Sequence, residues 1–358
     1  MPTTRSHRMS SFPRRKEVFV RLSSIAIAAV FGLAILAGGV SSTRADNGTL
    51  TVYTYSSFVS EWGPGPAIEE AFEAECGCDL DWVAVEDGAA LLSRLRLEGE
   101  DTDADIVLGL DTSLMASAAE TGLFAPHGVE MPIFSWTDLW NDPLFVPFDY
   151  GYFAVIYDSE IVTDPPTSLE ELVTGSPAEK IVLEDPRTST PGLGFLLWMR
   201  SVYGDAAPAK WRELEDRILT VAPGWSEAYG MFLDGEAPMV LSYTTSPAYH
   251  INAEGTDRYK AAIFSEGHYM QIEVAGMTRV TEEPDLAKQF LAFILTDAFQ
   301  STIPTGNWMY PVVFPRENLP AGFEDVVQEE SRALLFSPES VAANRQTWID
   351  EWLRALSD

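Results

Sequence analysis

Leu241-Ser242-Tyr243-Thr244-Thr245-Ser246-Pro247-Ala248-Tyr249 is the stretch around which this chain is organised. It continues the apolar residues 238–241, which predict a short buried strand. Hydroxyl-bearing residues then lead to Pro247, and proline is favoured at the first position of a helix, where a preceding Ser or Thr caps free N–H groups. We therefore predict a strand, a polar turn and a helix N-terminus, which together present hydroxyls, backbone donors and two tyrosine rings to a ligand in a cleft.

Upstream, the sequence alternates between strand and helix patterns. Residues 49–55, 80–85 and 105–110 predict strands, and residues 67–75 and 89–97 predict helices. This alternation is typical of βαβ units and a mostly parallel sheet, whose ligands bind beyond the carboxyl ends of the strands. The side chains predicted at such ends are Tyr55, Trp62, Asp87 and Asp111.

Residues 145–157 form a long extended segment without a helix signal, which predicts a crossover from one lobe to another. A strand at 180–184 then leads to Ser189 and Thr190, which precede a proline and an apolar helix. Such a helix N-terminus favours anions through its free N–H groups and dipole. Residues 223–229, which include Trp225, predict a further loop that enters a helix. Closing helices are expected at 290–299 and 337–356.

Residues 1–45 predict a cleaved signal peptide. Arginines and a lysine precede an apolar run at 25–36, and small residues at 41–45 form a cleavage site. The apolar run is shorter than the roughly 20 residues that a membrane span needs. We therefore expect the mature protein in the periplasm, and the sequence leaves open whether the general or the twin-arginine route exports it.

The chain is strongly acidic. The predicted leader carries seven of the 23 basic and one of the 54 acidic residues, so the remainder has a formal net charge of −37. This charge argues against binding to nucleic acid or to an anionic membrane surface. It suits a cationic ligand, but we favour the simpler explanation, which is solubility in a salty habitat. The remaining 313 residues are enough for two lobes of ordinary size.

Cys76 and Cys78 are the only cysteines. In an oxidising compartment they predict a disulfide, which Gly77 between them makes feasible. A metal site would need further ligands nearby, and no histidine is near in the sequence, so we favour the disulfide over a metal site.

Several runs together resemble the periplasmic thiamine-binding proteins of ABC importers. They lie at 50–55, 62–66, 145–152, 185–194, 224–230, 241–250, 264–269 and 303–311. The resemblance implies the two-lobed α/β fold of type II periplasmic binding proteins, in which each lobe is a mostly parallel sheet flanked by helices and crossover strands join the lobes. We expect residues 46–147 and 270–358 in lobe 1, residues 148–269 in lobe 2, and the ligand cleft between them.

The resemblance also implies a set of ligand contacts. They fall on Asp87, Gly88, Ser189, Thr190, Trp225, Tyr243, Thr244, Thr245 and Ser246, with Tyr55, Trp62, Tyr249 and Trp308 as further walls. The implied ligands are thiamine and its mono- and diphosphates, and the implied partner is an inner-membrane ABC permease. We expect a monomer that is not an enzyme and has no cofactor, no metal and no nucleic-acid partner.

The chemistry of these residues agrees with such a ligand. Aromatic faces hold a cationic heteroaromatic ring, and Asp87 can accept from an amine or offset the ring charge. The helix N-termini at Ser189-Thr190 and Thr245-Ser246 suit a hydroxyl or phosphate arm.

Three other functions stay open at this point. A thiaminase-like enzyme on a related fold would need an accessible thiolate with a base nearby. A ferric-iron binder would resemble proteins with adjacent tyrosines, and this chain has no Tyr-Tyr pair. A polyamine binder would need several carboxylates among aromatic side chains, and only Asp87 and Asp111 are well placed.

Overall fold

A computed structural model describes residues 48–132, 134, 140–313, 315–323 and 333–357, all within one unit of the chain, residues 44–358. The predicted signal peptide, residues 1–45, lies outside the described residues. Among the described helices, none combines the length and the apolar character needed to cross a bilayer.

The first strands of the sheet are parallel, as their alternation with helices predicts. β1 (Thr49–Tyr55) pairs with β2 (Asp79–Val85) along its whole length, and β3 (Ile106–Asp111) joins its other side. α1 (Gly65–Cys76) and α2 (Gly88–Glu98) connect these strands and cover the sheet. The carboxyl ends of β1 and β2 therefore lie at one edge.

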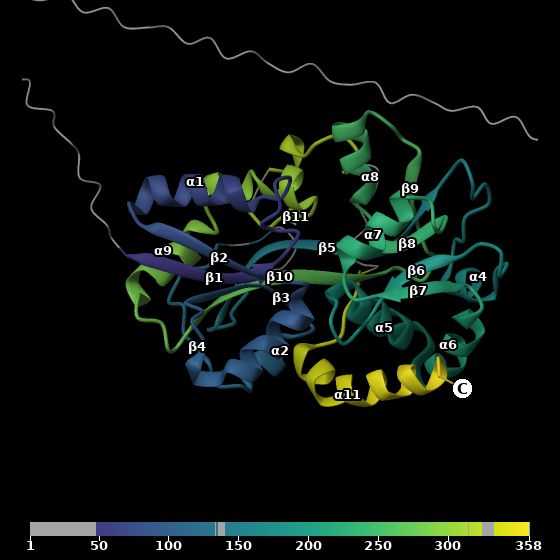
Figure 1. Ribbon diagram of the computed structural model, residues 1–358, viewed down its shortest axis with the longest axis horizontal. Helices are drawn as coiled ribbons and strands as arrows, with labels where there is room; N and C mark the ends of the chain where they lie inside the picture. The colour runs from purple at the N-terminus through teal and green to yellow at the C-terminus, as the bar shows by residue number, and fades with distance from the viewer. Residues whose placement is uncertain (1–47, 133, 135–139, 314, 324–332, 358) are drawn as a thin grey trace, which may run out of the picture. The chain divides into compact units, whose positions relative to one another are not determined.

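Two long antiparallel strands run through the middle of the sheet (Figure 1). β5 (Phe145–Asp158) pairs with β10 (His268–Thr278) as far as Tyr152, and from Phe153 onward it pairs with β8 (Met239–Tyr243) and β9 (Tyr259–Ala262). Helices cover both faces of the sheet, so nearly every residue of β5 is buried. The extended segment predicted at 145–157 is thus the strand that joins two halves of the sheet.

The second half of the sheet is again mostly parallel. β6 (Ile181–Glu184) pairs in parallel with β7 (Ile218–Ala222) and with β8. The helices of this half are α4 (Leu169–Thr174), α5 (Thr190–Tyr203), α6 (Ala207–Glu215) and α7 (Trp225–Leu233). The strand order β2-β1-β3-β10-β5-β8-β6-β7 confirms the predicted two-lobed α/β fold with crossover strands. The exact division into 46–147 with 270–358 and 148–269 stays a prediction.

The remaining elements are short or peripheral. They are α3 (Met115–Ala119), β4 (Phe124–Ala125), α8 (Ser246–Tyr249), α9 (Pro284–Phe293), α10 (Asp297–Gln300), β11 (Tyr310–Pro311), β12 (Ala333–Leu334) and α11 (Pro338–Ala355). The helix predicted at 290–299 is instead divided between α9 and α10, because Thr296 adopts an extended conformation and begins α10.

The C-terminal helix α11 follows its predicted apolar spacing, with Val341, Trp348 and Trp352 buried. It contacts α3 on one side and α5 and α6 on the other. The Trp352 ring meets Trp211 of α6 at a centroid distance of 6.4 Å. A helix assigned by the sequence to lobe 1 therefore also rests on helices of the second half.

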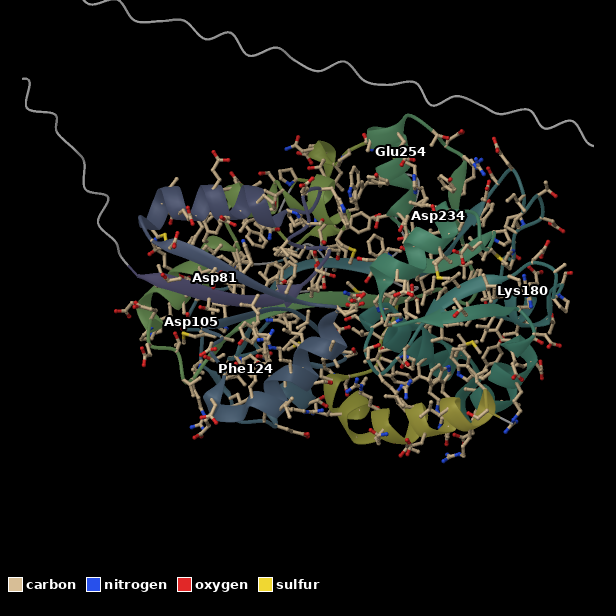
Figure 2. The ribbon with its side chains drawn as sticks, in the orientation of Figure 1. Asp81, Asp105, Phe124, Lys180, Asp234 and Glu254 are labelled. Atoms are coloured by element: carbon tan, nitrogen blue, oxygen red, sulfur yellow. A yellow bond between two sulfur atoms is a disulfide. The ribbon has the colours of Figure 1, made fainter. Side chains whose placement is uncertain are left out.

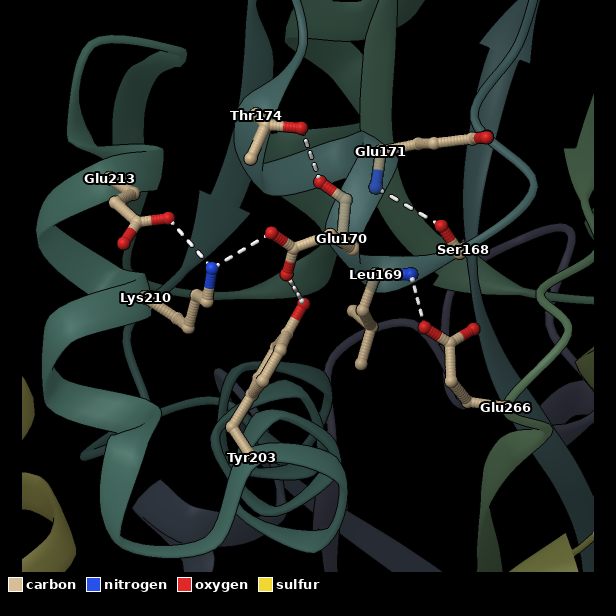
Figure 3. A network of polar contacts seen from close by, with 9 residues as sticks. All are labelled: Ser168, Leu169, Glu170, Glu171, Thr174, Tyr203, Lys210, Glu213 and Glu266. Atoms are coloured by element: carbon tan, nitrogen blue, oxygen red, sulfur yellow. Dashed lines mark hydrogen bonds and ion pairs between the residues drawn. The ribbon is translucent and has the colours of Figure 1, made fainter.

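Side chains fill the space between the sheet and the helices, and charged groups such as Asp234 and Glu254 lie at the periphery (Figure 2). One peripheral group on α4, α5 and α6 is shown in Figure 3. Lys210 Nζ lies 2.9 Å from Glu170 Oε1 and 2.8 Å from Glu213 Oε2, and the Tyr203 hydroxyl donates to Glu170. We call Glu170, Tyr203, Lys210 and Glu213 the outer cluster; its two carboxylates share one cation.

Candidate ligand-binding cleft

A cleft of about 250 Å³ lies beyond the carboxyl ends of β1, β2 and β8. Both halves of the sheet contribute to its lining. Eight of the thirteen ligand contacts expected from the sequence line it: Tyr55, Trp62, Asp87, Trp225, Tyr243, Ser246, Tyr249 and Trp308. The structure therefore brings residues from opposite ends of the described chain, such as Tyr55 and Trp308, to one cavity.

The other five expected contacts are buried behind the lining: Gly88, Ser189, Thr190, Thr244 and Thr245. Gly88 is needed for close approach, because a Cβ there would meet Gly109 O and Thr190 Oγ1 at 2.5 Å. Thr244 donates its backbone N–H to Tyr152 O and so fixes the turn after β8. These residues lie behind the lining, and their contact with a ligand stays a prediction.

Asp87 ties the start of α2 to the start of α5. Its side chain accepts from the Gly88 N–H at 2.8 Å and from the Ser189 hydroxyl at 3.0 Å. Burial raises the pKa of Asp87, and hydrogen bonds from Gly88, Ser189 and Thr190 oppose that rise. The sequence predicted that the helix N-terminus at Ser189-Thr190 suits an anionic arm. In the structure the Ser189 hydroxyl donates to Asp87, and the binding of an arm at this helix start stays a prediction.

The aromatic wall is built around Trp225, the first residue of α7. Its Nε1–H donates to Ser242 Oγ at 2.8 Å, and its ring stacks on Tyr229 at 5.0 Å. Trp62 lies 6.2 Å from Trp225 and is 51 % exposed, so it forms the rim of the cleft. These rings offer flat faces to a ligand, as cation binding by aromatic side chains requires.

Trp308 and Tyr249 form a second aromatic pair, edge to face at 5.5 Å. Trp308 follows the π-helical turn Ile303–Asn307 and has a φ of 55°. Among the described residues it is the only non-glycine with a positive φ, a conformation that costs roughly 1–3 kcal/mol and is often found at binding sites.

A pair of buried carboxyl groups, which was not predicted from the sequence, lies at the cleft. Glu273 of β10 lines the cleft, and Asp149 of β5 is its register partner on the neighbouring strand. Asn307 Nδ2 donates to Asp149 Oδ2 at 2.6 Å and to Glu273 Oε2 at 3.2 Å, and the Tyr55 hydroxyl donates to Glu273 Oε2 at 3.0 Å. We call Asp149 and Glu273 the carboxyl pair.

Burial dominates the electrostatics of the carboxyl pair. It raises the pKa of Asp149 to about 7. It also raises the pKa of Glu273 well above its ordinary value, and the charge of Asp149 adds to that rise. A charged residue within each of two long apolar strands was the sequence signal that could have revealed the pair, since charged groups are rarely buried without a reason.

The sequence analysis also missed other residues of the lining. They are Ser57, Glu86, Pro191, Ser226, Tyr229, Gly230, Leu233, Asn307 and Met309. Most of them flank an expected contact, and only the folded chain decides which neighbour turns toward the cavity. Asn307 and Met309 adjoin Trp308 and lie in or just after the π-helical turn, which no sequence pattern indicates.

Cys76 and Cys78 form a disulfide at the end of α1, and neither residue lines the cleft. Within the described ranges, no group of three or more His, Cys, Asp and Glu side chains is arranged to hold a metal ion. The cleft therefore offers rings, hydroxyls and carboxyl groups to a ligand, but no thiol.

This combination of a two-lobed fold and an aromatic cleft at strand ends defines a solute-binding protein. Residues 67–311 match the family model described as bacterial extracellular solute-binding protein, and the chain belongs to this family.

Three relatives within the family are named for binding thiamine. The chain is 58% identical over 309 residues to the thiamine-binding periplasmic protein of Brucella suis, covering 86% of this chain and 92% of the relative. It is 56% identical over 308 residues to the Escherichia coli K12 protein of the same name, covering 86% and 93%. A solved structure of a periplasmic thiamin binding protein superimposes with a TM-score of 0.83 at 55% identity, covering 87% of this chain and 96% of that one.

Proposed function

We propose that this protein captures thiamine in its cleft and delivers it to an ABC importer of the inner membrane. The observation that carries the proposal is the identity of 58% with a thiamine-binding periplasmic protein over nearly the whole described chain. The relatives are named as binding proteins, and both cysteines of this chain are held in a disulfide away from the cleft. The thiaminase-like alternative therefore lacks its nucleophile.

The lining suits the two rings of thiamine. Trp225, Tyr229 and Trp62 provide faces for a cationic heteroaromatic ring, each worth about 0.5–2 kcal/mol. Asp87 and Glu273 provide carboxyl groups within the cavity, which can accept from the exocyclic amine or offset the ring charge. Capture needs no chemical step, because the whole task is selective and reversible binding.

We propose that thiamine monophosphate and diphosphate are accepted as well. The hydroxyls of Ser57, Ser226 and Ser246 line the cleft, and Ser226 lies in the first turn of α7, whose free N–H groups favour an anion. The N-terminus of α5 is the second candidate for the arm, with the Ser189 hydroxyl engaged by Asp87. Titration calorimetry with thiamine monophosphate tests the extension, and an absence of heat removes it.

We further propose a monomer that works in the periplasm after removal of residues 1–45. The relatives are named as periplasmic proteins, and the basic and apolar leader agrees with export. The two halves of the sheet close on the ligand about β5 and β10, and a ligand that binds only the closed form shifts the population toward it. The closed form then docks on the permease.

Purified protein and a ligand panel test the function directly. Thiamine should raise the melting temperature and give a saturable heat of binding, whereas putrescine, spermidine and ferric citrate should do neither. A protein stabilised by a polyamine or by iron but not by thiamine would reverse the assignment. Incubation with thiamine should release no free thiazole, and the appearance of thiazole would mean that the protein is an enzyme.

A further inference from the structure

The carboxyl pair has an unusual position, because its two acids face each other across paired strands under the cleft. Asp149 is fully buried and Glu273 is 5 % exposed, with Glu273 in contact with the cavity. The Asn307 amide donates from Nδ2 to both acids, so one oxygen of each acid lies within hydrogen-bond distance of the same nitrogen. Two carboxyl groups this close cannot easily both be ionised.

The pair also lacks a cation. None of the ion pairs among the described residues includes Asp149 or Glu273. With both acids ionised, Asp149 Oδ1 is buried without an N–H or O–H donor in the described part of the chain, and a hydrogen bond joins the two carboxyl groups once one of them is protonated. A buried carboxyl group in this state needs a proton or a positive charge nearby.

The cavity next to the pair is where a positive charge can enter. The aromatic wall of Trp225, Tyr229 and Trp62 lines the same cavity as Glu273 and suits a cationic ring. Burial and the charge on Asp149 keep the pKa of Glu273 high in the free protein, and a cation within about 4–6 Å would lower it.

We propose that Asp149 and Glu273 are the subsite for the positively charged ring of the ligand, and that they hold one proton between them in the free protein and release it when that ring binds. The O–H bond of the protonated acid breaks, the proton passes to solvent, and the cation takes its place beside the pair. The inference rests on the proposed function and deepens it, because it assigns the charge of the ligand to residues other than Asp87.

The other groups near the pair do not take over this role. Tyr55 from β1 and Tyr243 from β8 have pKa values raised well above the ordinary range by burial, so both remain neutral. Asn307 carries no charge. Glu86 and Asp87, at the end of β2 and the start of α2, are further acids of the lining, and the charge of Asp87 adds to the rise in the pKa of Glu273. A test must therefore separate the pair from Asp87.

Titration calorimetry near pH 7, in phosphate and in Tris, measures the proton directly, because the heat of binding differs between buffers when a proton is released. The probes are thiamine and an isostere in which carbon replaces the charged ring nitrogen. We expect the heat of thiamine binding to differ between the two buffers. The heat of binding of the neutral isostere should be the same in both. Thiamine affinity should also rise with pH, since proton release on binding and pH-dependent affinity are linked.

Glu273→Gln should weaken thiamine binding by about tenfold or more and abolish the buffer dependence of its heat. The affinity of this variant for the neutral isostere should stay within about twofold of the wild-type value. Asp149→Asn should abolish the buffer dependence too. This second variant keeps the test decisive if Glu273→Gln fails to fold. Asp105→Asn changes a buried carboxyl group outside the lining. This control should bind thiamine with the affinity and the buffer dependence of the wild type.

A heat of thiamine binding that is the same in both buffers would overturn the inference and leave the proposed function standing. A buffer dependence that survives in both pair variants and disappears in Asp87→Asn would also overturn it, in favour of Asp87. No thiamine heat in any buffer would overturn the proposed function, and the inference with it.

Discussion

The outer cluster and the carboxyl pair both bring two acids together, but only the outer cluster contains its own cation. Glu170 and Glu213 have side chains about half exposed and share Lys210, whose hydrogen bond lowers the pKa of Glu170. Asp149 and Glu273 are buried and share only the neutral Asn307, and their pKa values are raised. Lys210 therefore balances carboxylate charge within the outer cluster, whereas the carboxyl pair has no cation of its own among the described residues.

The contrast explains how a strongly acidic protein can be selective. Exposed carboxylates are screened by water and salt and contribute little to binding at a distance. A buried pair beneath an aromatic wall keeps its effect, because the local dielectric constant is lower. We infer that the general acidity of the chain serves solubility, while selectivity for a cation depends on a few buried acids.

The largest expected effect comes from giving the carboxyl pair its own cation. Asn307→Lys places an ammonium group beside both acids, so it should satisfy them internally and repel a cationic ligand, lowering thiamine affinity by about a hundredfold. Asn307→Met has similar length and no charge, and calorimetry should find a loss at least about tenfold smaller. Equal losses in the two variants would show that shape, and not charge, decides binding at this position.

Removing one aromatic face should have the next largest effect. Trp225→Ala should lower thiamine affinity by about tenfold, because it removes a cation–π face and the partner of Tyr229. The melting temperature should change little, since Trp225 is only half-buried at the start of α7. Trp225→Phe retains a ring and should lose less. Unfolding of the Ala variant at room temperature would place Trp225 in the core instead of the site.

The pH dependence of stability distinguishes the two acidic groups in the ligand-free protein. A carboxyl group whose pKa is raised by folding binds more protons in the folded than in the unfolded state. The contribution of Asp149 is therefore fully present below its ordinary pKa of 3.8 and is lost as pH rises through about 7.

Asp149→Asn should accordingly flatten the loss of stability between these pH values, by about 1 kcal/mol or more in the free energy of unfolding. Denaturant titrations at several pH values measure this slope. A slope that Asp149→Asn leaves unchanged would mean that the pair does not retain a proton in the free protein.

The smallest effect should follow from breaking the outer cluster. Lys210→Met removes its cation but keeps the length of the side chain, and exposed ion pairs of this kind contribute at most about 1 kcal/mol. The free energy of unfolding should fall by no more than this, and thiamine affinity should stay unchanged. A clear loss of affinity would show that the two acidic groups are coupled.

The sequence predicted the architecture well because local patterns determine most of it. Strand and helix alternation identifies β1, β2 and β3, and the long extended segment identifies β5 as the crossover. Capping residues also mark helix starts correctly, as at Ser189 before α5 and Ser337 before α11. The division of the 290–299 helix was missed, since no proline or glycine marks it.

The site was predicted less completely, because tertiary pairing assembles it. Asp87 and Trp225 begin helices, where polar and aromatic residues are conspicuous in the sequence. Glu273 and Asp149 lie inside long strands, and only the register between β5 and β10 places them together. The Ser189 hydroxyl donates to Asp87, a hydrogen bond between two helix starts that the sequence did not predict, and the contact of Ser189 and Thr190 with a ligand stays a prediction.

A crystal structure of the protein with thiamine would show which acidic group lies beside the charged ring. We expect the positively charged ring within about 4–6 Å of the Glu273 carboxyl group, with a face toward the aromatic wall. A complex in which the neutral ring lies over Glu273, with the charged ring turned away from both Asp149 and Glu273, would overturn the assignment of the carboxyl pair.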